Sequence, residues 1–267
     1  MTAISNEKVV VYGASGFLGS HVADALTAAG YQVRLFDRVA SPFLKGNQEM
    51  IVGDIMDLEQ VIEAAKGTSI VYNFAAIADI DEAHDKPIPT ATINVLGNMH
   101  ALEAARIAGA RRFVFASTVY VYSESGSFYR ASKQAAERFT ETYFDRYGLE
   151  YNILRYGSLY GRRSDRRNGI YRMLREAVEQ HSITYKGSGE AMREYIHVED
   201  AARMSVQVLA PEFANRHLIL TGQEKLRIRD VMTMISEMMP WPVELHFDEA
   251  NTVHHYKITP YAFQPRI

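Results

Sequence analysis

Short apolar runs alternate with helical patterns along the first half of the chain, and this alternation predicts the fold. Lys8–Tyr12, Gln32–Phe36 and Arg112–Ala116 are mostly apolar runs, each long enough for one strand. Runs that are apolar at nearly every position are typical of strands buried on both faces of a parallel sheet. From Lys8 to Tyr156 the chain is therefore predicted to be α/β, with a doubly wound parallel Rossmann sheet.

The alternation ends after Tyr156, which predicts a second part. Residues 1–156 form the first domain in this interpretation. Residues 157–196 and 221–267 form a small C-terminal lobe, while residues 197–220 return to the first domain as a helix and a strand. A basic loop, Arg162–Arg167, precedes a helix that ends at about Gln180. Two interpretations of that loop stay open, a solvated flexible surface loop or a lid or phosphate-binding element.

The composition indicates a soluble globular protein of 267 residues, with 47% hydrophobic and 23% charged residues. A net charge of −3 provides no basic field for nucleic acid. The absence of cysteine excludes disulfides and thiolate catalysis. No apolar run approaches the roughly 18 residues of a membrane span, and no signal-peptide pattern opens the chain. We expect a cytoplasmic protein with no membrane or nucleic-acid partner.

The pair His254-His255 invites a metal interpretation, but adjacent side chains point in different directions on a strand or a helix. No cysteine or third histidine lies nearby, so we predict no metal site.

A glycine-rich turn follows the first predicted strand. Gly13, Gly16 and Gly19 recur at every third position, and a helix is expected to begin at about Phe17. Glycines at such positions allow a tight turn and close approach of the backbone to a pyrophosphate. The N–H groups at the helix start then face the phosphates. The turn predicts a dinucleotide site, although a surface turn beside an unrelated strand has the same spacing.

The second predicted strand ends at Asp37. A carboxylate there can accept hydrogen bonds from both hydroxyls of the adenosine ribose of NAD, and it repels the 2′-phosphate of NADP. Arg38 could soften that repulsion. The sequence therefore predicts NAD as the cofactor.

Tyr129 and Lys133 are four residues apart in a predicted helix from Phe128 to Tyr147, so they share one face. A nearby ammonium favours the phenolate and is expected to lower the pKa of Tyr129 from about 10. A tyrosine tuned in this way can take a hydroxyl proton while a hydride leaves the adjacent carbon. Thr118 ends the third apolar run, where its hydroxyl can bond the same substrate oxygen. Taken alone, Y-x-x-x-K also fits an ordinary exposed tyrosine.

From Lys8 to about residue 240, the sequence resembles the extended short-chain dehydrogenase/reductase family, in its NAD-dependent nucleotide-sugar epimerase/dehydratase branch. Beyond the glycine turn and the tyrosine motif, the blocks that carry this resemblance are Gly53-Asp54-Ile55, Asn73-Phe74-Ala75-Ala76, Asn94-Val95-Leu96-Gly97, Leu154 to Gly161, and Gly187 to Asp200. The resemblance implies that residues 1–156 bind NAD and that the lobe binds a nucleoside-diphosphate sugar.

The resemblance also implies roles for single residues. Thr118, Tyr129 and Lys133 would be catalytic, and Ser117, Thr118, Ser158 and Arg193 would bind substrate. The guanidinium of Arg193 suits a phosphate, because its planar fork pairs with two oxygens. The residues implied to contact NAD are Gly13, Ser15, Gly16, Phe17, Leu18, Gly19, Asp37, Arg38, Asp54, Ile55, Phe74, Ala75, Ala76, Asn94, Tyr129, Lys133 and Tyr156.

Two helices resemble those of the four-helix dimer interface in the family. They are the predicted helix from Ala91 to Ala108 and the helix that carries Tyr129. The resemblance implies a homodimer, while the alternative places both apolar faces in the core of one subunit.

The reaction is narrowed by two positions after Thr118. The 4,6-dehydratases of the family have Asp-Glu there, whereas this chain has Val119 and Tyr120. Neither side chain is a carboxylic acid, so dehydration is not expected. Epimerisation or oxidation at C4 of the sugar needs no further acid, and both outcomes stay open.

Three departures from the family pattern affect the substrate prediction. The segment between Thr118 and Tyr129 is about half the usual length, which should open the site toward the sugar. Ser158 replaces an asparagine that commonly contacts the sugar or its phosphate in the family. The chain also stops at Ile267, which is short for the family, so a terminal substrate-binding element could be missing or trimmed. Two alternatives therefore remain, an NAD(P)H-dependent reductase of a small or lipid-like carbonyl compound and a non-catalytic NAD-binding module.

Overall fold

The structure is a computed structural model that describes residues 7–123 and 126–248. Seven parallel strands form its central sheet in the spatial order β10-β6-β5-β4-β1-β2-β3. They are β1 (Lys8–Tyr12), β2 (Gln32–Asp37), β3 (Glu49–Val52), β4 (Ile70–Asn73), β5 (Arg112–Thr118), β6 (Glu150–Tyr156) and β10 (Arg216–Leu220). The strand order reverses between β1 and β4, so a crevice for ligand is expected at their carboxyl ends. The predicted α/β doubly wound sheet is confirmed.

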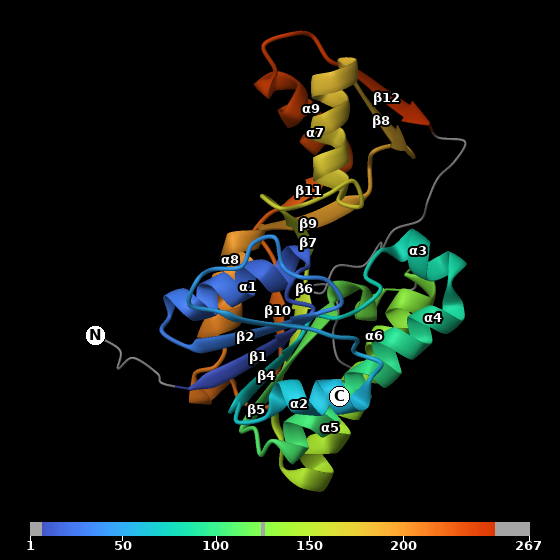
Figure 1. Cartoon of the computed structure of the whole chain (residues 1–267). Helices are drawn as coiled ribbons and strands as arrows, with labels where there is room; N and C mark the ends of the chain where they lie inside the picture. The colour runs from blue at the N-terminus through green and yellow to red at the C-terminus, as the bar shows by residue number, and fades with distance from the viewer. Residues whose placement is uncertain (1–6, 124–125, 249–267) are drawn as a thin grey trace.

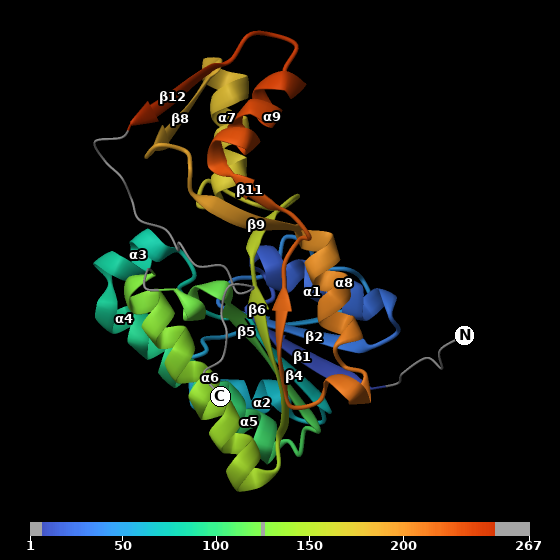
Figure 2. The ribbon, with the colours of Figure 1, turned by 180° about the vertical axis from the view of Figure 1, so that it is seen from behind.

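Helices cover both faces of the sheet (Figures 1 and 2). One face carries α1 (Phe17–Ala28) and α8 (Val198–Gln207). The other carries α2 (Leu58–Ala65), α5 (Gly97–Ile107) and α6 (Ser127–Tyr147). Each face encloses its own cluster of buried apolar side chains.

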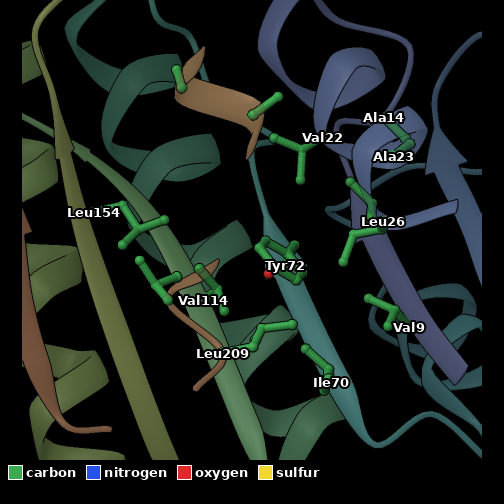
Figure 3. Packing of buried hydrophobic residues seen from close by; sticks show 14 of the residues in the cluster. Val9, Ala14, Val22, Ala23, Leu26, Ile70, Tyr72, Val114, Leu154 and Leu209 are labelled. Atoms are coloured by element: carbon green, nitrogen blue, oxygen red, sulfur yellow. The ribbon is translucent and has the colours of Figure 1, made fainter. Parts of the chain in front are cut away.

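Alternation along the strands divides these two clusters. In β1, Val9 and Val11 face α1, whereas Val10 and Tyr12 face α2. Figure 3 shows Leu26 of α1 lying over the β1 and β4 side chains of the first cluster. A strand buried on both faces has no polar side to show, which explains the continuous apolar runs of the sequence.

The predicted helix from Ala91 to Ala108 is helical, but its start and its winding differ from the prediction. It follows α3 (Ile80–Asp85) and consists of α4 (Pro87–Ala91), a π-helical turn η1 (Thr92–Leu96) and then α5. A π turn widens the helix by one residue and often marks a functional position. Here it contains Asn94, whose side chain is buried and hydrogen-bonded to two other segments.

The lobe lies beyond the carboxyl ends of the sheet (Figure 1). A three-stranded sheet of order β11-β9-β7 connects to it, and a two-stranded sheet, β12-β8, lies against a helix pair with its own apolar cluster. The elements are β7 (Ser158–Tyr160), α7 (Gly169–Gln180), β8 (Ser182–Lys186), β9 (Met192–His197), β11 (Lys225–Arg227), α9 (Ile228–Met238) and β12 (Glu244–Asp248). Two short 3-10 turns complete the described elements, η2 (Val119–Tyr122) and η3 (Pro211–Phe213).

After β9 the chain returns to the sheet. Helix α8 packs beside α1, and β10 pairs in parallel with β6, from Arg216 opposite Asn152 to Leu220 opposite Tyr156. These contacts support the proposed division of the chain at residues 156, 197 and 220.

Candidate active site

The glycine turn joins β1 to α1 at the point where the strand order reverses. Gly13 has a φ of +76°, and a Cβ atom there would lie 2.5 Å from the backbone nitrogen of Ala75. A Cβ atom on Gly19 would lie 2.2 Å from the carbonyl oxygen of Gly13. The turn therefore packs backbone against backbone, and any larger residue would push it apart. It leaves the start of α1 facing an open cavity.

This cavity has a volume of about 340 Å³ and lies over the carboxyl ends of β1, β2 and β4. Its lining includes ten of the residues that the resemblance implied for NAD: Gly13, Ser15, Gly16, Asp37, Arg38, Asp54, Ile55, Phe74, Ala75 and Ala76. Seven other residues complete it: Phe36, Val39, Gly53, Met56, Ile77, Ile93 and Arg167. The residues present fit NAD, because a phosphate cradle, a terminal carboxylate and an apolar slot follow one another along one cavity.

Asp37 occupies the place that fits the ribose. One of its carboxylate oxygens, Oδ2, accepts a hydrogen bond from the backbone N–H of Ser15 at 2.9 Å, and the Ser15 hydroxyl donates to the carbonyl of Val39 at 2.7 Å. The turn and the end of β2 thus hold each other. A fixed carboxylate at this point suits the two ribose hydroxyls of NAD and disfavours a 2′-phosphate.

Thr118, Tyr129 and Lys133 meet at the end of β5. The Thr118 hydroxyl hydrogen-bonds the phenol of Tyr129. The Lys133 ammonium donates to the carbonyl of Ala116 at 2.7 Å and lies 5.8 Å from the centre of the Tyr129 ring. All three predicted catalytic residues are buried side by side.

The electrostatics of this trio differ from the sequence prediction. Burial raises the pKa of Tyr129 to about 12, and the hydrogen bond with Thr118 offsets only part of that rise. Burial lowers the pKa of Lys133 to about 8, against a smaller raising effect of the Glu137 carboxylate. The prediction that Lys133 lowers the pKa of Tyr129 was wrong for the chain without bound cofactor or substrate. Desolvation outweighs it, because the ammonium points at Ala116 rather than at the phenol oxygen.

Ser117 lies on the opposite face of β5 from Thr118. Its hydroxyl donates to Glu137 at 2.5 Å, and Glu137 forms a two-pronged pair with Arg155, with N–O distances of 2.9 and 2.6 Å. Arg155 also contacts His217 of β10 at 2.7 Å. The structure thus joins Ser117 to a buried ion pair between α6 and β6 and does not bring it to the Tyr129 hydroxyl.

The remaining predicted site residues fall into three groups. Tyr156 bonds Ser205 of α8 at 2.6 Å, and Asn94 bonds Ile77 and Ser132, so both side chains are occupied within the protein. Phe17, Leu18 and Gly19 belong to the first turns of α1, beneath the cavity. Ser158 begins β7 and Arg193 belongs to β9, which are paired strands at the entrance to the lobe.

Arg193 is the buried cation at that entrance. It is 5% exposed, and its Nη1 donates to the carbonyl of Met192 at 2.7 Å. Its charge is close enough to lower the pKa of Tyr120 and of Tyr195 against the larger effect of burial, which raises both. Tyr120 in turn acts on Tyr129. Tyr120 is therefore close enough to both Arg193 and Tyr129 to interact electrostatically with each.

Residues 9–219 match the model of the NAD dependent epimerase/dehydratase family. The chain belongs to this family. The match bears out the resemblance read from the sequence and the NAD dependence expected from Asp37 and the glycine turn.

Three similar proteins illustrate the activities named within the family. A UDP-glucose 4-epimerase of Mycolicibacterium smegmatis is 27% identical over 266 residues, which cover 90% of this chain and 85% of that protein. A UDP-N-acetyl-alpha-D-glucosaminuronate decarboxylase of Bacillus cytotoxicus is 27% identical over 246 residues, or 82% and 75% of the two chains. The UDP-glucose 4-epimerase of Thermus thermophilus, solved with NAD, has a TM-score of 0.83 at 25% identity, covering 95% of this chain and 91% of that one.

A second cavity, of about 370 Å³, lies between α1 and α8. Asp24 lines it and is bound by Arg163 at 2.7 Å and by Lys45 at 3.2 Å. It contains none of the residues implied by the family, so the cavity at the glycine turn is the candidate site.

Sequence reasoning missed several residues of the site region, among them Ile77, Ile93, Glu137 and Arg167. Ile77 directly follows the family block that begins at Asn73, and Ile93 directly precedes the block that begins at Asn94. Glu137 lies one helical turn after Lys133, so the positions of these three residues carried a signal. Arg167 had none beyond the basic loop. Within residues 7–123 and 126–248, no cluster of three His, Cys, Asp or Glu side chains could hold a metal. His254 and His255 lie outside the described residues. Among the described helices, none combines the length and apolar character needed to cross a bilayer.

Proposed function

We propose that this chain is an NAD-dependent nucleotide-sugar 4-epimerase. The observation that carries the proposal is the buried trio of Thr118, Tyr129 and Lys133 on β5 and α6, in a chain whose NAD-shaped cavity is joined to α6 through Ile77 and Asn94. The family supplies the reaction class, and relatives named as UDP-glucose 4-epimerases supply the substrate class.

Tyr129 is the base in this proposal. Its phenol oxygen takes the proton of the sugar 4-hydroxyl while the C4 hydrogen leaves as hydride. Bound in the cavity, NAD would supply the hydride acceptor for this step and the hydride donor for return to the opposite face of the 4-keto sugar. Thr118 orients the shared oxygen. In this proposal the Lys133 ammonium favours the phenolate only when its charge faces the phenol oxygen instead of the Ala116 carbonyl, which it contacts in the chain by itself.

Val119 and Tyr120 favour epimerisation over dehydration, whereas oxidation at C4 would need no further acid either. Val119 is buried at 2% exposure, and Tyr120 is a phenol whose pKa burial raises. Neither can protonate a leaving hydroxyl as a carboxylic acid would. Arg193, which is buried and whose charge acts on Tyr120, is the proposed partner of the diphosphate.

The test is Tyr129→Phe, measured on UDP-glucose. We expect NAD binding to stay unchanged and formation of UDP-galactose to fall by about 10² to 10⁴-fold, the usual contribution of a general base. Tyr147→Phe is the matched control, because Tyr147 lies on the same helix and its side chain is 53% exposed.

Retained turnover in Tyr129→Phe would remove the base assignment. In the wild type, accumulation of NADH with a 4-keto product would indicate a dehydrogenase instead. Steady consumption of NAD(P)H by carbonyl compounds, with no affinity for any nucleoside diphosphate, would replace the proposal with the reductase.

A further inference from the structure

The basic loop between β7 and α7, Arg162–Arg167, is held in place at both ends by hydrogen bonds, and it is called the arm below. At its start, the Ser164 hydroxyl donates to the carbonyl of Gly161 at 2.7 Å, and Arg163 binds Asp24 of α1 at 2.7 Å. At its end, Asn168 donates to the carbonyl of Leu159 at 2.7 Å and caps α7 by accepting from the N–H of Tyr171 at 3.1 Å. Both ends of the loop are therefore fixed to regular elements.

Arg167 is held at the end of this arm by Asp165. Its backbone N–H donates to Asp165 at 2.9 Å, and its guanidinium donates to both carboxylate oxygens, the shortest contact being 2.6 Å. A two-pronged pair fixes the plane of a guanidinium as well as its position. The side chain is nevertheless 71% exposed, so donor atoms remain accessible on its outer edge.

Arg167 lines the cofactor cavity, although all the other lining residues lie between Gly13 and Ile93 in the sequence. Among them, Ser15 and Gly16 line the cavity at the start of α1. The carboxylates of Glu82 and Asp79 at the start of α3 also act on Arg167, and they add to the larger effect of Asp165 in raising its pKa. The arm therefore brings one cation to the rim of the cavity.

We propose that Arg167 is a further cofactor-binding residue, which places its guanidinium against the pyrophosphate of NAD opposite the glycine turn. The proposal rests on the proposed function, because it takes NAD as the ligand of the cavity. The glycine turn offers the phosphates only backbone N–H groups and the positive end of α1. A cation on the other side neutralises charge that these groups leave exposed.

The pyrophosphate is a better partner for Arg167 than a 2′-phosphate. A 2′-phosphate would lie beside Asp37, whose carboxylate is fixed by Ser15 and repels it. Arg38 follows Asp37 directly and is the cation nearest to that position in sequence. Arg167 instead lines the cavity together with Ser15 and Gly16 at the start of α1, and it is close enough to Asp79 and Glu82 at the start of α3 for their charges to raise its pKa.

The experiment compares Arg167→Gln with Arg166→Gln, using protein freed of bound nucleotide and titration calorimetry with NAD, adenosine and NADP. Arg166 is the exposed neighbour and does not line the cavity, so its variant removes the same charge from the same loop. We expect Arg167→Gln to weaken NAD binding by about tenfold, since an exposed charged hydrogen bond contributes modestly. Adenosine binding should stay unchanged in both variants, and the NAD loss should shrink as KCl is raised.

Each other outcome overturns the inference. Equal losses for NAD and adenosine would mean that Arg167 only supports the loop. An NADP loss much larger than the NAD loss would place the guanidinium at the 2′-phosphate. Unchanged NAD binding in Arg167→Gln would remove the contact altogether. If the wild type fails to bind NAD, the proposed function itself is wrong, so the two failures are distinguishable.

Discussion

Lys133 is a charged residue in the interior of the protein, with 4% of its surface exposed. Its ammonium has three N–H donors, one of which bonds Ala116. Burial lowers its pKa from 10.5 to about 8. A depressed lysine pKa means that the unfolded chain binds the proton more tightly than the folded one. At pH 7 this difference reduces the free energy of unfolding by about 3 kcal/mol.

Lys133→Met should therefore stabilise the fold while it abolishes epimerisation. We expect the free energy of unfolding to rise by about 3 kcal/mol at pH 7. The gain is full below pH 8 and shrinks between pH 8 and about 10.5, where the wild type loses its buried charge. Urea denaturation at pH 7 and pH 10 measures both values.

Lys86→Met is the control, because Lys86 is exposed and pairs only with Glu82 along the surface of α3. It should change neither the stability nor its pH dependence by more than about 0.5 kcal/mol. If the Lys133→Met protein is less stable than the wild type at both pH values, burial of the ammonium does not lower the free energy of unfolding.

Spacing was enough to predict that Thr118, Tyr129 and Lys133 gather, because i and i+4 share a helix face and a strand end is a fixed point. It was not enough to predict the sign of the Tyr129 pKa shift. That sign depends on which oxygen the ammonium faces and on how much protein covers the phenol. Neither quantity is a property of sequence separation.

Asn94 shows how one element can hold two others. It lies in the π turn η1, where its side-chain N–H groups donate to the carbonyl of Ile77 at 3.0 Å and to the Ser132 hydroxyl at 2.9 Å. Its side-chain oxygen accepts the N–H of Ile77 at 2.8 Å. The loop after β4, which lines the cofactor cavity, is thereby fixed to α6.

Asn94→Leu should loosen that loop. The change leaves both backbone groups of Ile77 without their partner, which costs about 3 kcal/mol of stability. Because Ile77 lines the cavity, NAD binding should weaken as well. Chemical denaturation and NAD titration measure the two effects.

Thr140→Val provides the comparison. Thr140 is buried on α6 and bonds the carbonyl of Ala136 at 2.8 Å, away from the cavity. It should lower stability slightly and leave NAD affinity alone. If Asn94→Leu behaves in the same way, the Asn94 contacts stabilise the fold without shaping the cavity.

At the level of elements, the periodicity predicted the helix from Ala91 to Ala108 but not the π turn inside it. A π turn inserts one residue without changing which residues are apolar, so the pattern around Asn94 looks like that of a regular helix. The basic loop was similarly ambiguous. Its arginines fit a solvated surface equally well until Asp165 and Asn168 are seen to brace it.

The outer surfaces of α5 and α6 bear on how two whole molecules could associate. Exposed apolar side chains lie along them, with Ile107 at 49%, Phe139 at 37% and Tyr147 at 53%. Exposed apolar patches on adjacent helices often mark interfaces. We propose a homodimer through these two helices. Their inner faces, with Leu102 and Ala136, belong to the core of one subunit.

Phe139→Glu should convert that dimer to a monomer, because it would bury a charge at the interface without a partner. Light scattering coupled to gel filtration measures the mass directly. Val178→Glu is the control, since Val178 is 49% exposed on α7 of the lobe and should leave the mass unchanged. A monomeric wild type would disprove the dimer.

The sheet of the whole molecule was predictable, because strands buried on both faces have no polar positions and this signal is strong. The lobe was predicted only as a region. Its strands β7 and β11 are three residues each, too short for any period to appear.

The position of β10 in the sequence determines how late in synthesis the central sheet can be completed. This strand closes the edge of the sheet beside β6, yet 59 residues separate Tyr156 from Arg216, and they include the first part of the lobe, residues 157–196. During synthesis, β6 leaves the ribosome long before its partner and has an open edge until β10 arrives. The first part of the lobe is therefore synthesised while the edge of β6 is still unpaired.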